Sequence, residues 1–176
     1  VTAQVEHGRL KGILSDSQAQ LVLTCESDKT AADQWLSACG QVNQIDCITT
    51  DTLPDIDIIE PTANEPVAFL QYTSGSTGHP KGVIITHRNL LHNLEQIYLS
   101  FQHSQDSVGV SWLPPYHDMG LIGGILQPLF GGFEANLMSP LTFLRRPARW
   151  LAAISKYKAT SSGAPNFAYE LCIKYA

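Results

Sequence analysis

The chain has 176 residues, of which 44% are hydrophobic and 15% are charged, and its net charge is −5. This balance predicts one globular unit that buries its own core, and it argues against nucleic acid as the main partner, because a nucleic-acid site needs a basic patch. No apolar run reaches the roughly 18 to 20 residues that cross a bilayer, and the polar N-terminus is unlike a signal peptide. We therefore expect a cytoplasmic protein with no membrane span.

The first third of the chain alternates between helical and strand patterns. Apolar residues recur at helical spacing over residues 6–20, and a short apolar run follows over residues 21–24. Residues 31–39 predict a second helix and residues 45–49 a second strand. This alternation indicates an α/β fold. Residues 51–66, which contain three prolines and several carboxylates, are expected to form a solvated connector.

Residues 72–82 are the most informative segment, because they combine glycines, hydroxyls and one lysine between two apolar runs. Glycine lets the backbone approach a ligand closely, so that successive N–H groups converge on an anion. Hydroxyl donors and a mobile lysine charge suit phosphate oxygens. The predicted ligands of a polyphosphate are Thr73, Ser74, Gly75, Ser76, Thr77, Gly78, Lys81 and Gly82.

Three other interpretations of this segment compete with phosphate binding. A Walker loop requires Gly-Lys-Ser/Thr at the start of a helix, whereas Lys81 follows Pro80 and precedes Gly82. Residues 82–86 read as a strand, so the segment joins two strands. Gly-x-Ser-x-Gly is absent from it, which argues against a serine-hydrolase elbow. A plain turn rich in serine and glycine stays open as an alternative.

The next helix is predicted to begin after Thr86, a candidate N-cap. Its apolar residues from Leu90 to Phe101 form one stripe at helical spacing. His87 and His92 lie five residues apart, so they do not share a helix face as metal ligands would. We interpret both histidines as surface side chains.

A candidate ligand-binding loop lies between the next two elements. Residues 108–112 predict a strand, and residues 119–130 predict a glycine-containing helix that ends at residues 131–132. The intervening loop carries an aromatic residue, a histidine and a carboxylate at positions 116–118. Open α/β sheets bind ligands at the carboxyl ends of their strands, so this loop is expected to line a site.

The C-terminal part of the chain continues the alternation. A strand is expected over residues 134–138 and another over residues 160–163, with a helix from residue 167 onward. The helix predicted over residues 147–157 points three side chains inward, which are Trp150, Leu151 and Ile154.

The four cysteines show no metal or disulfide pattern. Cys25, Cys39, Cys47 and Cys172 have no Cys-x-x-Cys spacing and no matching pair of histidines. Zinc sites and disulfide frameworks depend on such spacing. We therefore expect reduced thiols and no metal site formed by protein ligands.

Three segments resemble the adenylate-forming superfamily and, within it, the fatty acyl-AMP ligases. Residues 72–82 look like the phosphate loop of the superfamily, and residues 113–121 and 162–172 are similar to the ligase subfamily. The resemblance implies a layered β-sheet with flanking helices. It also implies that residues 1–176 are a single fragment of the N-terminal AMP-binding domain, without the C-terminal domain, and that the isolated fragment is inactive.

The same resemblance implies that the parent enzyme is an ATP-dependent acid ligase. It would use ATP and Mg²⁺ to convert a fatty acid into acyl-adenylate and pyrophosphate. The acyl group would then pass to the phosphopantetheine thiol of an acyl carrier protein in polyketide or nonribosomal peptide biosynthesis. Two alternatives stay open, which are an acyl-CoA synthetase and a non-catalytic nucleotide-binding module.

Side-chain roles follow from the resemblance and from the loop position. Lys81 would hold phosphates during catalysis, and His117 would line the passage between the acyl group and the α-phosphate. A general base beside Asp118 and a structural histidine remain alternative roles for His117. Leu121 and Ile122 belong either to an acyl pocket or to the core. The expected substrate-binding residues are Tyr116, His117, Met119, Gly120, Gly163, Ala164 and Pro165.

Overall fold

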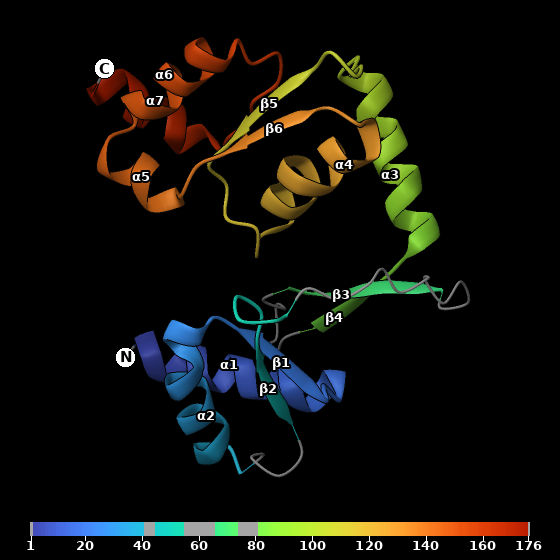
Figure 1. Cartoon of the computed structure of the whole chain (residues 1–176), viewed down its shortest axis with the longest axis vertical. Coiled ribbons are helices and arrows are strands. Elements are labelled where there is room, and N and C mark those ends of the chain that lie inside the picture. The colour runs from blue at the N-terminus through green and yellow to red at the C-terminus, as the bar shows by residue number, and fades with distance from the viewer. Residues whose placement is uncertain (1, 41–44, 55–65, 74–80, 176) are drawn as a thin grey trace. The chain divides into compact units, whose positions relative to one another are not determined.

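The structure of the chain is a computed structural model that describes residues 2–40, 45–54, 66–73 and 81–175 (Figure 1). Helices alternate with strands throughout, which confirms the predicted α/β class. The chain divides into two compact units, Val1–Thr86 and His87–Ala176. That the whole chain belongs to one N-terminal AMP-binding domain stays a prediction.

The first unit opens with two helix and strand pairs. The predicted helices and strands all occur, and each observed boundary lies within four residues of the expected one. β1 and β2 pair in parallel, the second helix packs against β2, and Leu36 of that helix is buried. The elements are α1 (Thr2–Ser17), β1 (Leu21–Thr24), η1 (Glu26–Asp28), α2 (Lys29–Ala38) and β2 (Asp46–Thr49).

Strands lie on both sides of the predicted phosphate loop, as expected, and they form an antiparallel pair. β3 (Val67–Thr73) pairs with β4 (Lys81–Thr86), and the register ends with Thr73 opposite Lys81. Among the described residues the strands form three two-stranded sheets, β1–β2, β3–β4 and β5–β6.

In the second unit a parallel strand pair lies between helices. Figure 1 shows β5 and β6 side by side, with η2 and α4 on one side and α6 and α7 on the other. The elements are α3 (His87–Ser100), β5 (Val108–Ser111), η2 (Met119–Leu126), α4 (Gln127–Gly131), β6 (Glu134–Leu137), α5 (Pro140–Arg145), α6 (Ala148–Tyr157) and α7 (Asn166–Tyr175).

The core of the second unit is built around large aromatic side chains. The Trp112 and Phe143 rings stack with centroids 3.9 Å apart, and the Trp150 ring meets Phe143 edge to face. Phe143 and Trp150 are almost completely buried. Rings of this size supply much of the apolar area that a small core removes from water. The buried cluster comprises Val110, Trp112, Phe143, Trp150, Ala168 and Cys172.

Two predictions for the C-terminal part were wrong. Leu151 was expected to face inward, but it is 41% exposed, because it lies beside the stripe that Trp150 places in the core. Residues 160–163 form no strand, and only Ser161 pairs, by a single bridge to Gly109. Irregular backbone up to Pro165 prevents a longer ladder. Helix α5 was not predicted.

The helix predicted over residues 119–130 exists but has two parts. Its first eight residues, η2, have π-type hydrogen bonding, shown by the Gln127 N–H donating to the Ile122 carbonyl. α4 continues it and ends at Gly132, whose φ of 66° is left-handed, so the predicted glycine stop is confirmed. Wide helical turns of this type often occur at functional sites.

Several expectations from composition can be compared with the described residues. Cys25, Cys39, Cys47 and Cys172 are all free thiols, as predicted. His87 and His92 are exposed, which confirms their surface position. Within the described ranges, no helix combines the length and apolar character needed to cross a membrane, and no three metal-binding side chains cluster together.

Candidate functional site

The predicted phosphate site begins where the β3–β4 hairpin ends. The register places Thr73 directly opposite Lys81, and both residues are exposed. Within the described ranges, no carboxylate lies within ion-pair distance of the Lys81 ammonium. A hydroxyl and a cation therefore flank the point at which the predicted loop leaves the sheet. The other predicted ligands, Ser74, Gly75, Ser76, Thr77 and Gly78, lie outside the described residues.

The strand position before Thr73 is fixed by contacts of Tyr72. The Tyr72 hydroxyl donates to Asp16 Oδ2 of α1 at 2.6 Å, and this hydrogen bond is the main cause that raises the pKa of Tyr72. The tyrosine ring lies directly over Gly82, its cross-strand partner. A Cβ atom at residue 82 would lie only 2.9 Å from Tyr72 Cζ, so the tyrosine ring would have to shift to accept any side chain there.

The loop that follows β5 holds His117 and Asp118 together. His117 Nδ1 lies 2.6 Å from Asp118 Oδ1, and both side chains are more than half exposed. The Asp118 carboxylate also accepts from the Met119 N–H at 2.7 Å, which caps the start of η2. Tyr116, which was predicted to bind substrate, is 91% exposed. The three residues thus form a polar rim at the strand end.

Two glycines let η2 pack tightly against the chain that follows β5. A Cβ atom at Gly120 would lie 2.0 Å from the Pro114 carbonyl oxygen, and one at Gly124 would lie 3.1 Å from Ser111 Oγ. The two positions are four apart, so they share a helix face. Gly120, predicted as a substrate-binding residue, therefore faces the protein backbone.

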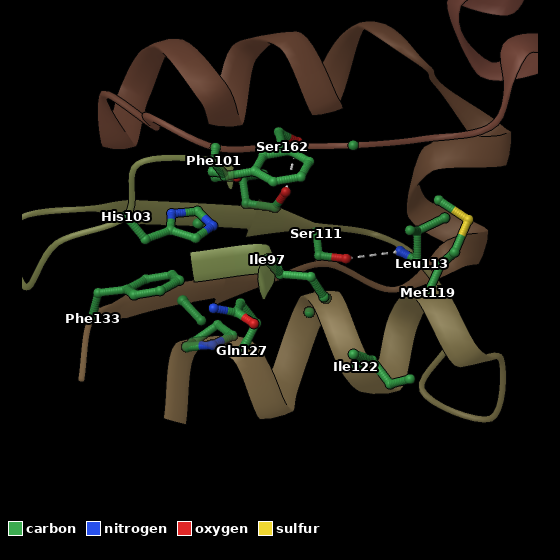
Figure 2. A pocket seen from close by; sticks show the side chains of 18 of the residues that line it. Ile97, Phe101, His103, Ser111, Leu113, Met119, Ile122, Gln127, Phe133 and Ser162 are labelled. Atoms are coloured by element: carbon green, nitrogen blue, oxygen red, sulfur yellow. Dashed lines mark hydrogen bonds between the residues drawn. The ribbon is translucent and has the colours of Figure 1, made fainter. Parts of the chain in front are cut away.

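η2 also borders a pocket of about 360 Å³ within the second unit (Figure 2). This volume lies within the range of small-molecule sites, which are concave and mainly apolar. The lining comes from α3, β5, η2, α4, β6 and the segment after α6, and most of it is hydrophobic. Figure 2 shows Met119 and Leu113 at one end of the pocket, with His103 and Phe133 at the other.

The structure brings only some of the predicted substrate-binding residues into this pocket. Met119 and Gly163 line it, together with Ile122, for which the sequence left pocket and core equally open. Leu121 does not line it. Ala164 packs against the aromatic core instead. The lining also omits Tyr116, His117, Gly120 and Pro165.

Among the lining residues that were not predicted from the sequence, His103 and Gln127 carry polar side chains into a mainly apolar wall. His103 lies between the Phe101 and Phe133 rings, with its centroid 4.7 Å from that of Phe133. Burial lowers the pKa of His103, so its ring is neutral at pH 7. Gln127 lies on the floor of the pocket. Gln127 is the single polar residue in the apolar run of residues 119–130, and this pattern could have pointed to it.

A family model for AMP-binding enzymes matches residues 1–176. The chain belongs to the AMP-binding enzyme family. Two curated relatives are medium-chain-fatty-acid–[acyl-carrier-protein] ligases. This AMP-binding chain is 56% identical to TtuA of Teredinibacter turnerae over 66% of its own length and 18% of the relative. It is 41% identical to JamA of Moorena producens over 94% of its length and 29% of the relative.

A solved structure gives the same relationship at the level of the fold. The crystal structure of a fatty acyl-adenylate ligase from L. pneumophila, in complex with acyl adenylate and pyrophosphate, matches with a TM-score of 0.80 and 42% identity. The match covers 96% of this AMP-binding chain and 29% of that structure. The chain therefore spans less than a third of the length of these relatives.

Proposed function

We propose that the protein containing this chain is a fatty acyl-AMP ligase, which activates a fatty acid with ATP to acyl-adenylate and pyrophosphate. The observation that carries the proposal is the apolar pocket beside the polar rim of His117 and Asp118. An apolar pocket suits an alkyl tail, and a polar rim suits the carboxylate and phosphate that react. The fatty acid ligases among the relatives support this substrate class.

ATP, when bound, supplies the adenylyl group, and Mg²⁺ is proposed as the ion that offsets the phosphate charge. Thr73 and Lys81 fit a polyphosphate, since a hydroxyl donor and a cation stand opposite each other at the hairpin end. With residues 74–78 and Gly82 they would hold and orient the phosphates. Catalysis of this kind depends on positioning and on stabilising developing charge, and it needs no protein nucleophile.

The proposed acyl acceptor is the phosphopantetheine thiol of an acyl carrier protein. The names of the TtuA and JamA relatives support this choice over coenzyme A. Supplying the full-length protein with coenzyme A or with a holo-carrier protein, and identifying the thioester formed, distinguishes the two acceptors. A cytoplasmic location, where ATP and carrier proteins are available, belongs to the same proposal.

The test of the main proposal is ATP–pyrophosphate exchange by the full-length protein in the presence of fatty acids. We expect exchange that depends on the fatty acid. His117→Ala is expected to weaken it without unfolding the protein, because the side chain is exposed. His92→Ala, an exposed histidine of α3, is the matched control. If the exchange rate does not rise when any of the fatty acids is added, the proposed function is wrong. If His117→Ala exchanges as fast as the wild-type protein, only the proposed role of His117 is wrong.

A further inference from the structure

Gln127 is the most unusual polar side chain in the second unit. It is 1% exposed, yet neither its amide nitrogen nor its amide oxygen has a hydrogen-bond partner among the residues that the structure describes. A buried amide without partners is costly, because it has lost its hydrogen bonds to water. Such a group calls for a ligand atom or another partner.

Two other polar groups that line the pocket already have partners. Ser111 Oγ accepts from the Leu113 N–H at 3.3 Å. Ser162 Oγ accepts from Trp150 Nε1 at 2.8 Å and donates to the Val110 carbonyl oxygen at 2.6 Å. These two serines therefore support the walls. The Gln127 amide, by contrast, has no hydrogen-bond partner among the residues that the structure describes.

The position of Gln127 indicates which part of a ligand it would meet. It follows Met119 by eight residues along one continuous helix, a distance on the order of 10 Å. Figure 2 shows it on the helix side of the pocket, nearer to Phe133 than Met119 is. A fatty acid whose carboxylate lies at the Met119 end of the pocket would place the distal part of its tail near Gln127.

We propose that Gln127 is a specificity-determining residue that binds a hydroxyl group on the distal part of the acyl tail. The proposal rests on the proposed function, and it narrows the substrate class from plain to hydroxylated fatty acids. A carboxamide both donates and accepts, as a hydroxyl does, so one hydroxyl can satisfy the amide. A plain alkyl tail fills the apolar lining but leaves the amide unpaired.

The first test needs only the unmodified full-length protein. ATP–pyrophosphate exchange is measured with decanoic acid and with the series of its monohydroxy isomers, a medium-chain probe like the substrates named for two relatives. We expect one position in the distal half of the chain to raise kcat/KM by about tenfold over decanoic acid. Equal or lower values at every hydroxyl position would overturn the proposal.

Variants then assign the preference to Gln127. Gln127→Met keeps the length of the side chain and removes the amide, and we expect it to abolish the hydroxyl preference while decanoic acid remains a substrate. Gln96→Met, at an exposed position of α3, should keep the preference. If Gln127→Met keeps the preference, Gln127 is not the determinant. If Gln127→Met does not fold, the isomer series alone decides.

The two proposals fail in different ways. Exchange with decanoic acid but no preferred hydroxyl position removes the Gln127 proposal and leaves the ligase function standing. Absence of exchange with every acid removes both. A preferred position that disappears in Gln127→Met alone supports both.

Discussion

The hairpin of the first unit and the pocket of the second unit present their functional groups in different ways. The β3–β4 hairpin carries Thr73 and Lys81 at its end, and several of its apolar side chains, such as Ile84, are exposed. The pocket, by contrast, adjoins a core in which Phe143 and Trp150 are almost completely buried. The hairpin site therefore depends on local strand pairing, whereas the pocket depends on the packing of distant segments.

Removing an aromatic side chain from the core of the second unit should lower the unfolding free energy more than the other substitutions do. Trp150→Ala deletes a buried indole that contacts Phe143 and bonds Ser162, so we expect a loss of about 3 to 5 kcal/mol in unfolding free energy. Urea unfolding of the full-length protein, followed by circular dichroism, measures this loss. Leu144→Ala, at an exposed position of α5, is the control. Similar losses in both variants would contradict the central position of Trp150.

A methyl group on the packed face of η2 should have the next largest effect. Gly120→Ala forces a Cβ atom against the Pro114 carbonyl, and we expect a cost of about 1 to 3 kcal/mol from overpacking, with displacement of the His117 loop. Gly123→Ala is the stability control, because no atom lies within 4 Å of its Cβ position. Thermal unfolding of both variants checks the contrast. An unchanged Gly120→Ala protein would show that η2 does not need this close contact.

The hairpin and the pocket also differ in how well the sequence predicts them. The hairpin was predictable, because its donors are contiguous and its strands, such as residues 67–72, are apolar runs. The pocket was predictable only in part, because its walls come from segments between Ile97 and Gly163. Met119 and Gly163 were predicted to bind substrate, and Ile122 was left open between pocket and core. Gln127 was not predicted, because burial without a partner is a property of the packed structure.

Three further features could not be predicted from the sequence, for physical reasons. The bond between Tyr72 and Asp16 joins residues 56 positions apart, and no local pattern specifies such a pair. Gly120 belongs to a recognisable motif, but its close contact with Pro114 depends on how η2 approaches β5. Leu151 was misplaced because helical spacing alone does not fix the edge of the buried stripe.

A smaller effect is expected at the hairpin, since Tyr72 and Asp16 are exposed to solvent. Tyr72→Phe removes the hydrogen bond to Asp16 and should loosen the strand before Thr73. We expect a higher KM for ATP with little change in the thermal midpoint. A double-mutant cycle with Asp16→Ala measures the coupling between the two residues. If the two substitutions are additive, the hydrogen bond does not hold the strand in place.

The smallest expected effect is a dependence of the unfolding free energy on pH, caused by His103 in the second unit. Burial lowers the pKa of His103 below its ordinary value of 6.5, so between the lowered value and 6.5 the unfolded chain binds a proton more readily than the folded one. The contribution of His103 to the unfolding free energy is therefore full above pH 6.5 and is lost as the pH falls toward the lowered pKa.

Urea midpoints measured on both sides of pH 6.5 should fall on acidification, and they should fall less in His103→Phe, which keeps a ring between Phe101 and Phe133. His92→Phe, at an exposed site, should keep the wild-type slope. Equal slopes in all three proteins would mean that the pocket does not desolvate His103, and the contrast between a buried pocket and an exposed hairpin would be weaker.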